Sequence, residues 1–218
     1  MTSEIAILYL DDDQVGDRLF QRALATQYLR RSAAVSLVII HGAGEPAERL
    51  LESRGFVPEW SSGALRPASE SEQELVERAA REAGRRIAGA LTDAGISAVA
   101  VSASDRNLLS TDEDGRVRAA RAHWLLELVQ LDVVPVIALL GRVPETNAIR
   151  ELDVASAILA LADALDPEAS SVVAVAVDAS VEPTGARERK REVLSHVAAG
   201  GIDLRMTELP SIFGSDAG

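Results

Sequence analysis

The stretch VSLVIIHGAG, residues 35–44, decides the fold class. Residues 35–40 are mainly apolar and β-branched, which is typical of a strand buried on both faces of a parallel sheet. The glycine-containing turn 41–44 follows directly, and residues 45–54 then show helical spacing up to a stop at Gly55. A buried strand, a glycine turn and a helix in this order indicate the strand–helix unit of an α/β protein.

The same alternation of strand and helix extends in both directions along the chain. Further apolar runs predict strands at residues 5–10, 98–102, 133–140, 172–178 and 202–206. Helical spacing predicts helices at residues 14–31, 69–93, 117–130, 153–165 and 187–199, the second with a break near Gly84 or Gly89. Residues 57–68 contain two prolines and predict a loop or small hairpin. We therefore expect an α/β fold in which helices cover both sides of a mostly parallel sheet, in one domain over residues 1–218.

Composition narrows the classes of function. The chain has 218 residues, no cysteine and a formal net charge of −12. Without cysteine there are no disulfides or thiolate metal ligands, and His41, His123 and His196 lack the spacing of a zinc site, so we expect no metal site. The negative charge argues against nucleic acid or an anionic membrane as the main partner. Because we find neither a signal-peptide pattern nor an apolar run of membrane-spanning length, we expect a cytoplasmic location.

The turn at Gly42, Ala43 and Gly44 is the first candidate site. It follows a strand and precedes a helix, so backbone N–H groups and a helix N-terminus are able to face an anionic ligand there. The alternative is a tight turn without a ligand, because the spacing matches neither the dinucleotide-binding nor the P-loop glycine motif.

Polar residues at two other places are candidates for substrate contact. Ser102 and Asn107 are the first and last residues of a polar segment at the end of the strand 98–102, where open α/β sheets bind ligands. The alternative is a turn whose side chains form hydrogen bonds with its own backbone. Arg66, in the segment 57–68, is able to grip a carboxylate with two parallel hydrogen bonds; the alternative is a solvated surface arginine.

Charged residues open the last two predicted helices. Asp153 begins the first of them, either as a simple N-cap or as a carboxylate that orients catalytic groups near phosphate. The basic residues at the start of the second form a solvated face or neutralise a phosphate, and they are Arg187, Arg189, Lys190 and Arg191. Cations in a first turn oppose the helix dipole, which hints at an anion nearby.

Taken in chain order, these segments resemble the acetylglutamate kinase branch of the amino acid kinase family. The matching segments are IIHGAG at 39–44, GALRPA at 63–68, VSASD at 101–105, VPVIA at 134–138 and ELD at 151–153, followed by the strand 172–178. Their shared order and spacing over roughly residues 5–180 carry the resemblance. It implies a three-layer α/β/α sandwich, a dimer or higher oligomer, a substrate-binding half at about 1–150 and a shortened nucleotide-binding half at about 151–218.

The resemblance also implies roles for single residues. Gly42 and Gly44 match the glycine loop near the substrate and the transferred phosphoryl group, and Arg66 matches the arginine that binds the substrate carboxylate. Asp153 matches the aspartate that organises the catalytic lysines. The implied cofactors are ATP and Mg²⁺, and the residues expected at the nucleotide side are Gly42, Gly44, Asp178 and Arg187, with Lys190 or Arg187 replacing the family's second lysine.

Three departures from the family pattern concern the phosphate-handling groups. Where the family has a lysine and a glycine pair in its first strand, the chain has Leu8 followed by Tyr9, Leu10 and Asp11, and a leucine is unable to stabilise a transferring phosphoryl group. The family's substrate-binding asparagine has no clear match, since Ile149 and Glu151 fall in that stretch and Asn147 is near but out of register. After residue 178 the chain reaches its last helix almost at once, where the family spends many residues on the nucleotide pocket.

Three hypotheses follow from this pattern. The first is a non-catalytic family member that binds a small acidic ligand of the acylated amino-acid type, as a sensor or as a subunit of a homo-oligomer or hetero-complex. The second is an ATP-dependent kinase that converts a side-chain carboxylate to an acyl phosphate. The third uses the acidic run 11–13 to hold Mg²⁺ or to act as a base; the alternative for that run is a solvated turn that caps the next helix.

Overall fold

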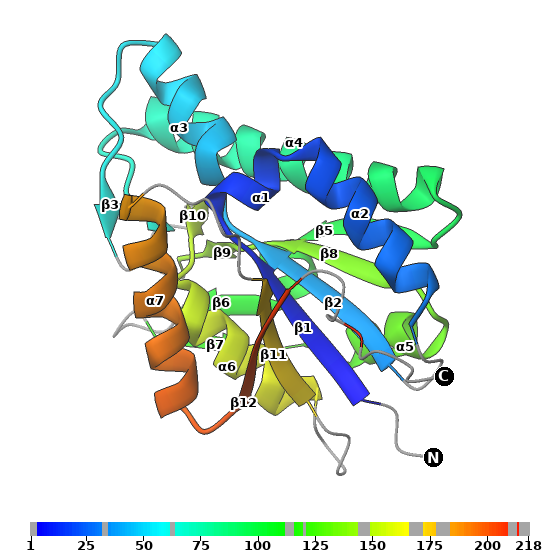
Figure 1. Ribbon diagram of the computed structural model, residues 1–218. Coiled ribbons are helices and arrows are strands. Elements are labelled where there is room, and N and C mark those ends of the chain that lie inside the picture. Colours follow the sequence, from blue (N-terminus) through cyan, green and yellow to red (C-terminus); the bar gives the residue numbers. More distant parts are fainter. Residues whose placement is uncertain are drawn as a thin grey trace.

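A six-stranded sheet lies at the centre of the molecule (Figure 1). The computed structural model describes residues 4–31, 35–61, 64–111, 116–119, 121–143, 149–165, 172–177, 184–208 and 213. In the order β12-β11-β1-β2-β8-β5, every neighbouring pair of strands runs parallel. The strands are β12 Asp203–Thr207, β11 Val172–Val177, β1 Glu4–Leu10, β2 Val35–His41, β8 Val134–Ala138 and β5 Ala98–Ser102.

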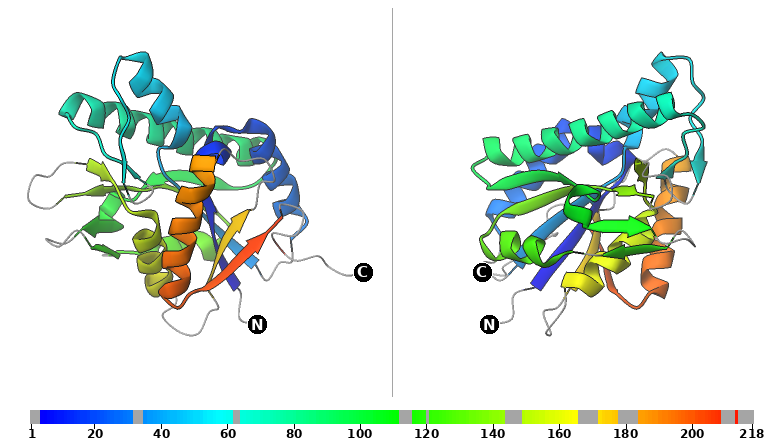
Figure 2. Two further views of the ribbon diagram at one scale, coloured as in Figure 1. Left: turned by 60° about the vertical axis from the view of Figure 1, so that its left-hand side comes forward. Right: turned by 180° about the vertical axis from the view of Figure 1, so that it is seen from behind.

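Helices cover both faces of this sheet, so the predicted three-layer α/β/α arrangement is confirmed (Figures 1 and 2). One face carries α1 Asp12–Gly16, α2 Arg18–Leu29, α3 Gly44–Ser53 and α4 Glu70–Asp93, and the other carries α5 His123–Gln130, α6 Val154–Leu165 and α7 Thr184–Ala199. The alternation of side chains along β1 explains the two layers. Leu8 belongs to the same apolar cluster as Leu24 of α2 and Ile87 of α4, whereas Ile7 clusters with Ile158 of α6.

Short strands form two smaller sheets beside the central one. The first has the order β10-β9-β6-β7, with β10 Ile149–Glu151, β9 Leu140–Arg142, β6 Leu109–Thr111 and β7 Val117–Ala119. The second is the hairpin of β3 Trp60–Ser61 and β4 Ala64–Leu65, which agrees with the hairpin expected within residues 57–68. The prediction of one helix over 117–130 is wrong, because residues 117–119 pair with β6 and the helix begins only at His123.

Two helix predictions change for local reasons. The single helix expected over 14–31 is two helices, since the carboxylate of Asp17 accepts hydrogen bonds from the N–H groups of Leu19 and Phe20 and so caps a new helix, α2. The break expected near Gly84 or Gly89 is absent, because α4 runs as one helix through both glycines. A Cβ at Gly84 would lie 3.1 Å from Nε2 of His41, so that glycine allows the close approach of a buried imidazole.

Parallel pairing brings the carboxyl ends of β1, β2, β8 and β11 to one edge of the sheet, near α1, α3 and β3 in Figure 1. Open α/β sheets bind their ligands at this edge. The turn after β2, the hairpin β3–β4 and the strand β10 all lie there, and they supply the residues of the candidate site. No described helix is both long and apolar enough to cross a membrane.

Candidate functional site

The turn between β2 and α3 requires glycine at two positions. Gly44 has a φ of +59°, in the left-handed region that other residues rarely adopt. Gly42 is needed for a different reason, since a Cβ there would lie 2.4 Å from Oε1 of Glu151. The turn is therefore shaped around the carboxylate of Glu151, which comes from β10, more than a hundred residues later in the chain.

Glu151 joins three segments at the carboxyl edge of the sheet. Its Oε1 accepts a hydrogen bond from the N–H of Ala43, and its Oε2 accepts one from the N–H of Leu65 at 2.6 Å. Its backbone carbonyl oxygen accepts a bond from Nη1 of Arg66 at 3.1 Å. The side chain of Glu151 is buried, with the residue 3% exposed. The turn that was predicted to bind an anion thus binds the carboxyl group of Glu151, a side chain of the chain itself.

Burial sets the protonation of this carboxyl group. Removal from water raises the pKa of Glu151 from its ordinary value of 4.5 to about 7. The N–H groups of Ala43 and Leu65 act in the opposite direction because they favour the charged form, while nearby Asp12 raises the pKa and Arg66 lowers it. The carboxyl group consequently changes its charge near neutral pH.

A second buried ionic contact lies at the end of β1. Nζ of Lys190, from α7, donates to Oδ2 of Asp11 at 2.8 Å and also to the carbonyl oxygen of Val177. Asp11 and Lys190 are 6% and 5% exposed. Oδ1 of Asp11 also accepts from the N–H of Gln14 at 3.0 Å, which caps α1. Asp11 does cap the next helix as expected, but it is buried and paired rather than solvated.

Three further predicted site residues are Asp153, expected to orient catalytic groups, and Asp178 and Arg187, expected at the nucleotide side. Asp153 is the N-cap of α6, since its Oδ1 accepts from the N–H of Ser156 at 2.8 Å and its carbonyl oxygen from the N–H of Ala157 at 3.0 Å. Asp178 lies outside the described residues. Arg187 lies in α7, but its side chain is outside what the structure describes.

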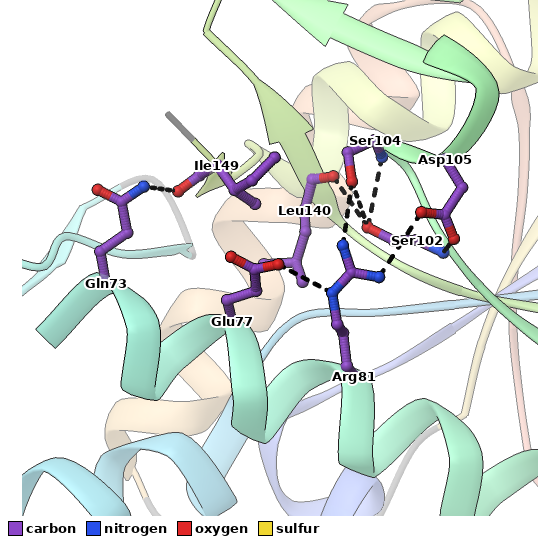
Figure 3. Close-up of polar contacts among 8 residues, drawn as sticks. All are labelled: Gln73, Glu77, Arg81, Ser102, Ser104, Asp105, Leu140 and Ile149. Atoms are coloured by element: carbon purple, nitrogen blue, oxygen red, sulfur yellow. Dashed lines mark hydrogen bonds and ion pairs between the residues drawn. The ribbon is translucent and has the colours of Figure 1, made fainter. Parts of the chain in front are cut away.

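The segment that contains Ser102 is bonded to its own turn and to α4 (Figure 3). The hydroxyl of Ser102 is buried, donates to the carbonyl oxygen of Leu140 at 3.2 Å and lies 2.9 Å from Oγ of Ser104. Oδ2 of Asp105 accepts from the N–H of Ser102 at 2.8 Å. From α4, Nε of Arg81 donates to Oε1 of Glu77 at 2.9 Å, and the same side chain reaches Ser104 and Asp105. These contacts are those of a self-bonded turn.

The same view shows how α4 holds the strands that carry the site. The amide of Gln73 donates to the carbonyl oxygen of Ile149 in β10, two residues before Glu151 (Figure 3). The Ser102 hydroxyl holds β9 through Leu140, and β9 pairs antiparallel with β10. Asn107, by contrast, is exposed and has a φ of +56°. Ser102 therefore contributes to the framework around Glu151, and Asn107 turns toward solvent.

His41 is a functional candidate that the sequence did not single out. Its imidazole is fully buried; Nδ1 lies 2.7 Å from the carbonyl oxygen of Gly42, and Nε2 has no hydrogen-bond partner among the described residues. Burial lowers the pKa of His41 to about 4, so the ring is neutral at physiological pH. Within the part of the chain that the structure describes, no three His, Asp or Glu side chains are grouped so as to hold a metal ion.

Comparison with known proteins identifies the family. The sequence model of the amino acid kinase family matches residues 11–176, which is more than half of the 218 residues. No curated protein sequence matches the chain.

Among solved structures, N-acetylglutamate synthase from Neisseria gonorrhoeae, in complex with coenzyme A and N-acetyl-glutamate, has a TM-score of 0.70 at 18% identity over 97% of this chain. The chain spans 57% of that protein's length. Isopentenyl phosphate kinase has a TM-score of 0.66 at 17% identity, and the alignment covers 96% of this chain and 93% of the kinase chain. E. coli aspartokinase III, in complex with aspartate and ADP, has a TM-score of 0.57 at 15% identity, and the alignment covers 79% of this chain and 49% of the aspartokinase chain. Identities this low show the fold alone, and it is the match to the family's sequence model that shows that the chain belongs to the amino acid kinase family.

Proposed function

We propose that this chain is a member of the family that does not transfer phosphate and that instead binds a small acidic ligand of the acylated amino-acid type, as a sensor or as a subunit of a larger assembly. The observation that carries the proposal is the carboxylate of Glu151, bonded to the N–H groups of Ala43 and Leu65 inside the glycine turn. The carboxylate of Glu151 accepts hydrogen bonds from the same N–H groups that would bind the carboxylate of an acidic ligand.

The geometry around Glu151 supports a site that opens by exchange. An acidic ligand that displaces Glu151 would meet the N–H groups of Ala43 and Leu65 and the half-buried guanidinium of Arg66. Charge-assisted bonds to a carboxylate are among the stronger contacts in proteins, and Arg66 adds a fork that matches carboxylate geometry. In the absence of ligand, Glu151 keeps the same donors satisfied, so they are never left buried without a partner.

The described residues at this edge do not fit a magnesium–triphosphate complex. Phosphoryl transfer needs positive groups aimed at the phosphates. Leu8, in the position of the family's first lysine, is apolar and fully buried. Lys190 donates to Asp11, which offsets its charge, and the glycine turn faces the carboxylate of Glu151. Each of these features would repel or fail to stabilise a transferring phosphoryl group.

One observation favours the alternative, an ATP-dependent kinase that phosphorylates a carboxylate. The chain covers 93% of the isopentenyl phosphate kinase structure, so a chain of this length does not by itself lack room for the kinase fold. ADP is present in the aspartokinase structure, which makes ATP the nucleotide to test. The alternative requires Lys190 to leave Asp11 and Glu151 to leave the glycine turn before ATP binds.

Calorimetric titration with N-acetyl-L-glutamate, without nucleotide, tests the sensor role. We expect one binding site per chain and at least about tenfold tighter binding in the variant Glu151→Ala, because the internal competitor for Ala43 and Leu65 is removed. The matched control is Glu127→Ala, which removes an exposed acid of α5. Equal affinity in the wild-type protein and Glu151→Ala, or equal gains in Glu151→Ala and Glu127→Ala, would contradict exchange at the glycine turn.

A further inference from the structure

A cavity of about 470 Å³ is lined by residues of α2 and α4. These two helices belong to the helical layer that covers one face of the sheet (Figure 1). Three arginines line it: Arg18 and Arg22 from α2 and Arg86 from α4. Asp93 is the one acidic residue of the lining, so three positive charges and one negative charge give a formal +2. This local charge is opposite in sign to the net charge of −12 of the whole chain.

No carboxylate among the described residues forms an ion pair with the three guanidinium groups. Among the described residues, Arg18, Arg22 and Arg86 form no ion pair, whereas other arginines do, such as Arg81 with Glu77 and Arg31 with Asp132. Three unpaired cations that face one concave space produce a positive potential there, and such a potential concentrates anions.

The positions of the cations are unfavourable for the helix that carries two of them. Arg18 and Arg22 are four residues apart, so two like charges lie on the same side of α2, an arrangement that destabilises a helix slightly. Arg18 is also the first residue of α2, where a positive charge opposes the helix dipole. A bound anion would offset both effects.

The wall opposite α2 leaves space for a ligand. Gly89, one turn after Arg86 in α4, lines the cavity, and a Cβ placed there would meet nothing within 4 Å. The cavity volume falls within the range of small-molecule sites in proteins. Arginine binds phosphate and carboxylate groups with two parallel hydrogen bonds, so three arginines around one space suit a ligand with more than one anionic group.

We propose that this cavity binds a small molecule with several negative charges, carried by phosphate or carboxylate groups. Arg18, Arg22 and Arg86 bind the anionic groups, and the open side at Gly89 receives the rest of the ligand. The guanidinium of Arg86 does act electrostatically on His41, beside the glycine turn. The residues that line this cavity, however, are not among those that bond Glu151. The proposed site therefore stands whether or not the proposed function holds.

The test is calorimetric titration of the full chain with two probes, inorganic pyrophosphate and citrate, at fixed ionic strength. We expect one site per chain, with Arg22→Gln and Arg86→Gln each weakening binding about tenfold or more, since each removes a charge-assisted contact. The stronger probe identifies phosphate or carboxylate as the recognised group. Both arginines are exposed, and circular dichroism checks that the variants fold.

Arg78→Gln is the matched control, because Arg78 is an exposed arginine of the same helix that does not line the cavity. Three results would overturn the proposal: no binding of either probe to the wild-type protein, unchanged affinity in Arg22→Gln and Arg86→Gln, or an equal loss in Arg78→Gln. The last of these would mean that the probes respond to total charge and not to this cavity.

Discussion

The carboxylate of Glu151 takes the space that a side chain at Gly42 would need, since a Cβ on Gly42 would lie 2.4 Å from Oε1 of Glu151. A glycine turn in an α/β protein commonly leaves its N–H groups to a ligand. Here the same turn is closed by an acid from β10 that also bonds Leu65 of β4. Any side chain at position 42 would therefore have to displace the carboxylate of Glu151.

We predict that Gly42→Ala destabilises the protein by about 2 kcal/mol, because the new Cβ pushes the Glu151 side chain away and leaves the N–H groups of Ala43 and Leu65 unpaired. Urea unfolding measures the change. In a Glu151→Ala background the same substitution should cost clearly less, since the carboxylate it displaces is gone. The control is Gly89→Ala, which meets no atoms within 4 Å in α4 and should be neutral or stabilising. Equal costs of Gly42→Ala in both backgrounds would show that the two residues do not interact.

Two buried groups near the glycine turn should make stability depend on pH in opposite directions. The raised pKa of Glu151, about 7, means that stability is lost as pH rises from about 4.5 through 7, because the folded protein holds a proton that the unfolded chain releases. The lowered pKa of His41, about 4, means that stability is lost as pH falls from about 6.5 through 4, because the unfolded chain binds a proton that the folded protein does not bind. Between about pH 4.5 and 6.5 the two effects largely cancel.

Single substitutions should separate these two effects. In Glu151→Gln the contribution of His41 remains, so the free energy of unfolding should fall more steeply on acidification than in the wild-type protein. In His41→Asn the contribution of Glu151 remains, so stability should fall as pH rises over the same range. Urea unfolding at several pH values from 4.5 to 7.5 gives the three slopes. If all three proteins share one slope, neither group titrates as its burial indicates.

The ion pair of Asp11 and Lys190 gives a third prediction. Lys190→Met leaves the carboxylate of Asp11 buried without its cation, which should cost roughly 3–5 kcal/mol. Asp11→Asn in the same protein removes the charge but keeps an N-cap for α1, so the double variant should recover most of the loss. Thermal and urea unfolding measure both steps. Arg191→Met, at the exposed neighbouring position, serves as the control, and a loss there equal to that of Lys190→Met would refute a special role for the buried pair.

Local patterns were sufficient to predict the layers of this fold. The run 35–44 carries its own strand, turn and helix start, and β2 and α3 form there. The split between α1 and α2 was not predicted, although Asp17 is an N-cap residue at the right place. The three-residue strands β6, β7 and β10 were not predicted from the sequence, because strands this short depend on their pairing partners more than on their own residues.

The candidate site depends on contacts between segments far apart in the sequence. Glu151 looked like a mismatch with the family pattern, and only the fold shows that it reaches the turn at Ala43, 108 residues away. Asp11 and Lys190 are separated by 179 residues, and each alone is an ordinary charged residue. One signal was available in the sequence, because Glu151 falls in the stretch where the acetylglutamate kinase pattern has a substrate-binding asparagine.

The most direct test of the central claim is the rate of ADP release from Mg–ATP by the purified chain, measured with and without N-acetyl-L-glutamate and a panel of other acylated amino acids. The closure of the glycine turn by Glu151 and the pairing of Lys190 with Asp11 predict no ligand-dependent ADP release. Ligand-dependent release at rates of about 1–100 s⁻¹, as in ordinary kinases, would contradict the proposal and establish the chain as an active phosphotransferase.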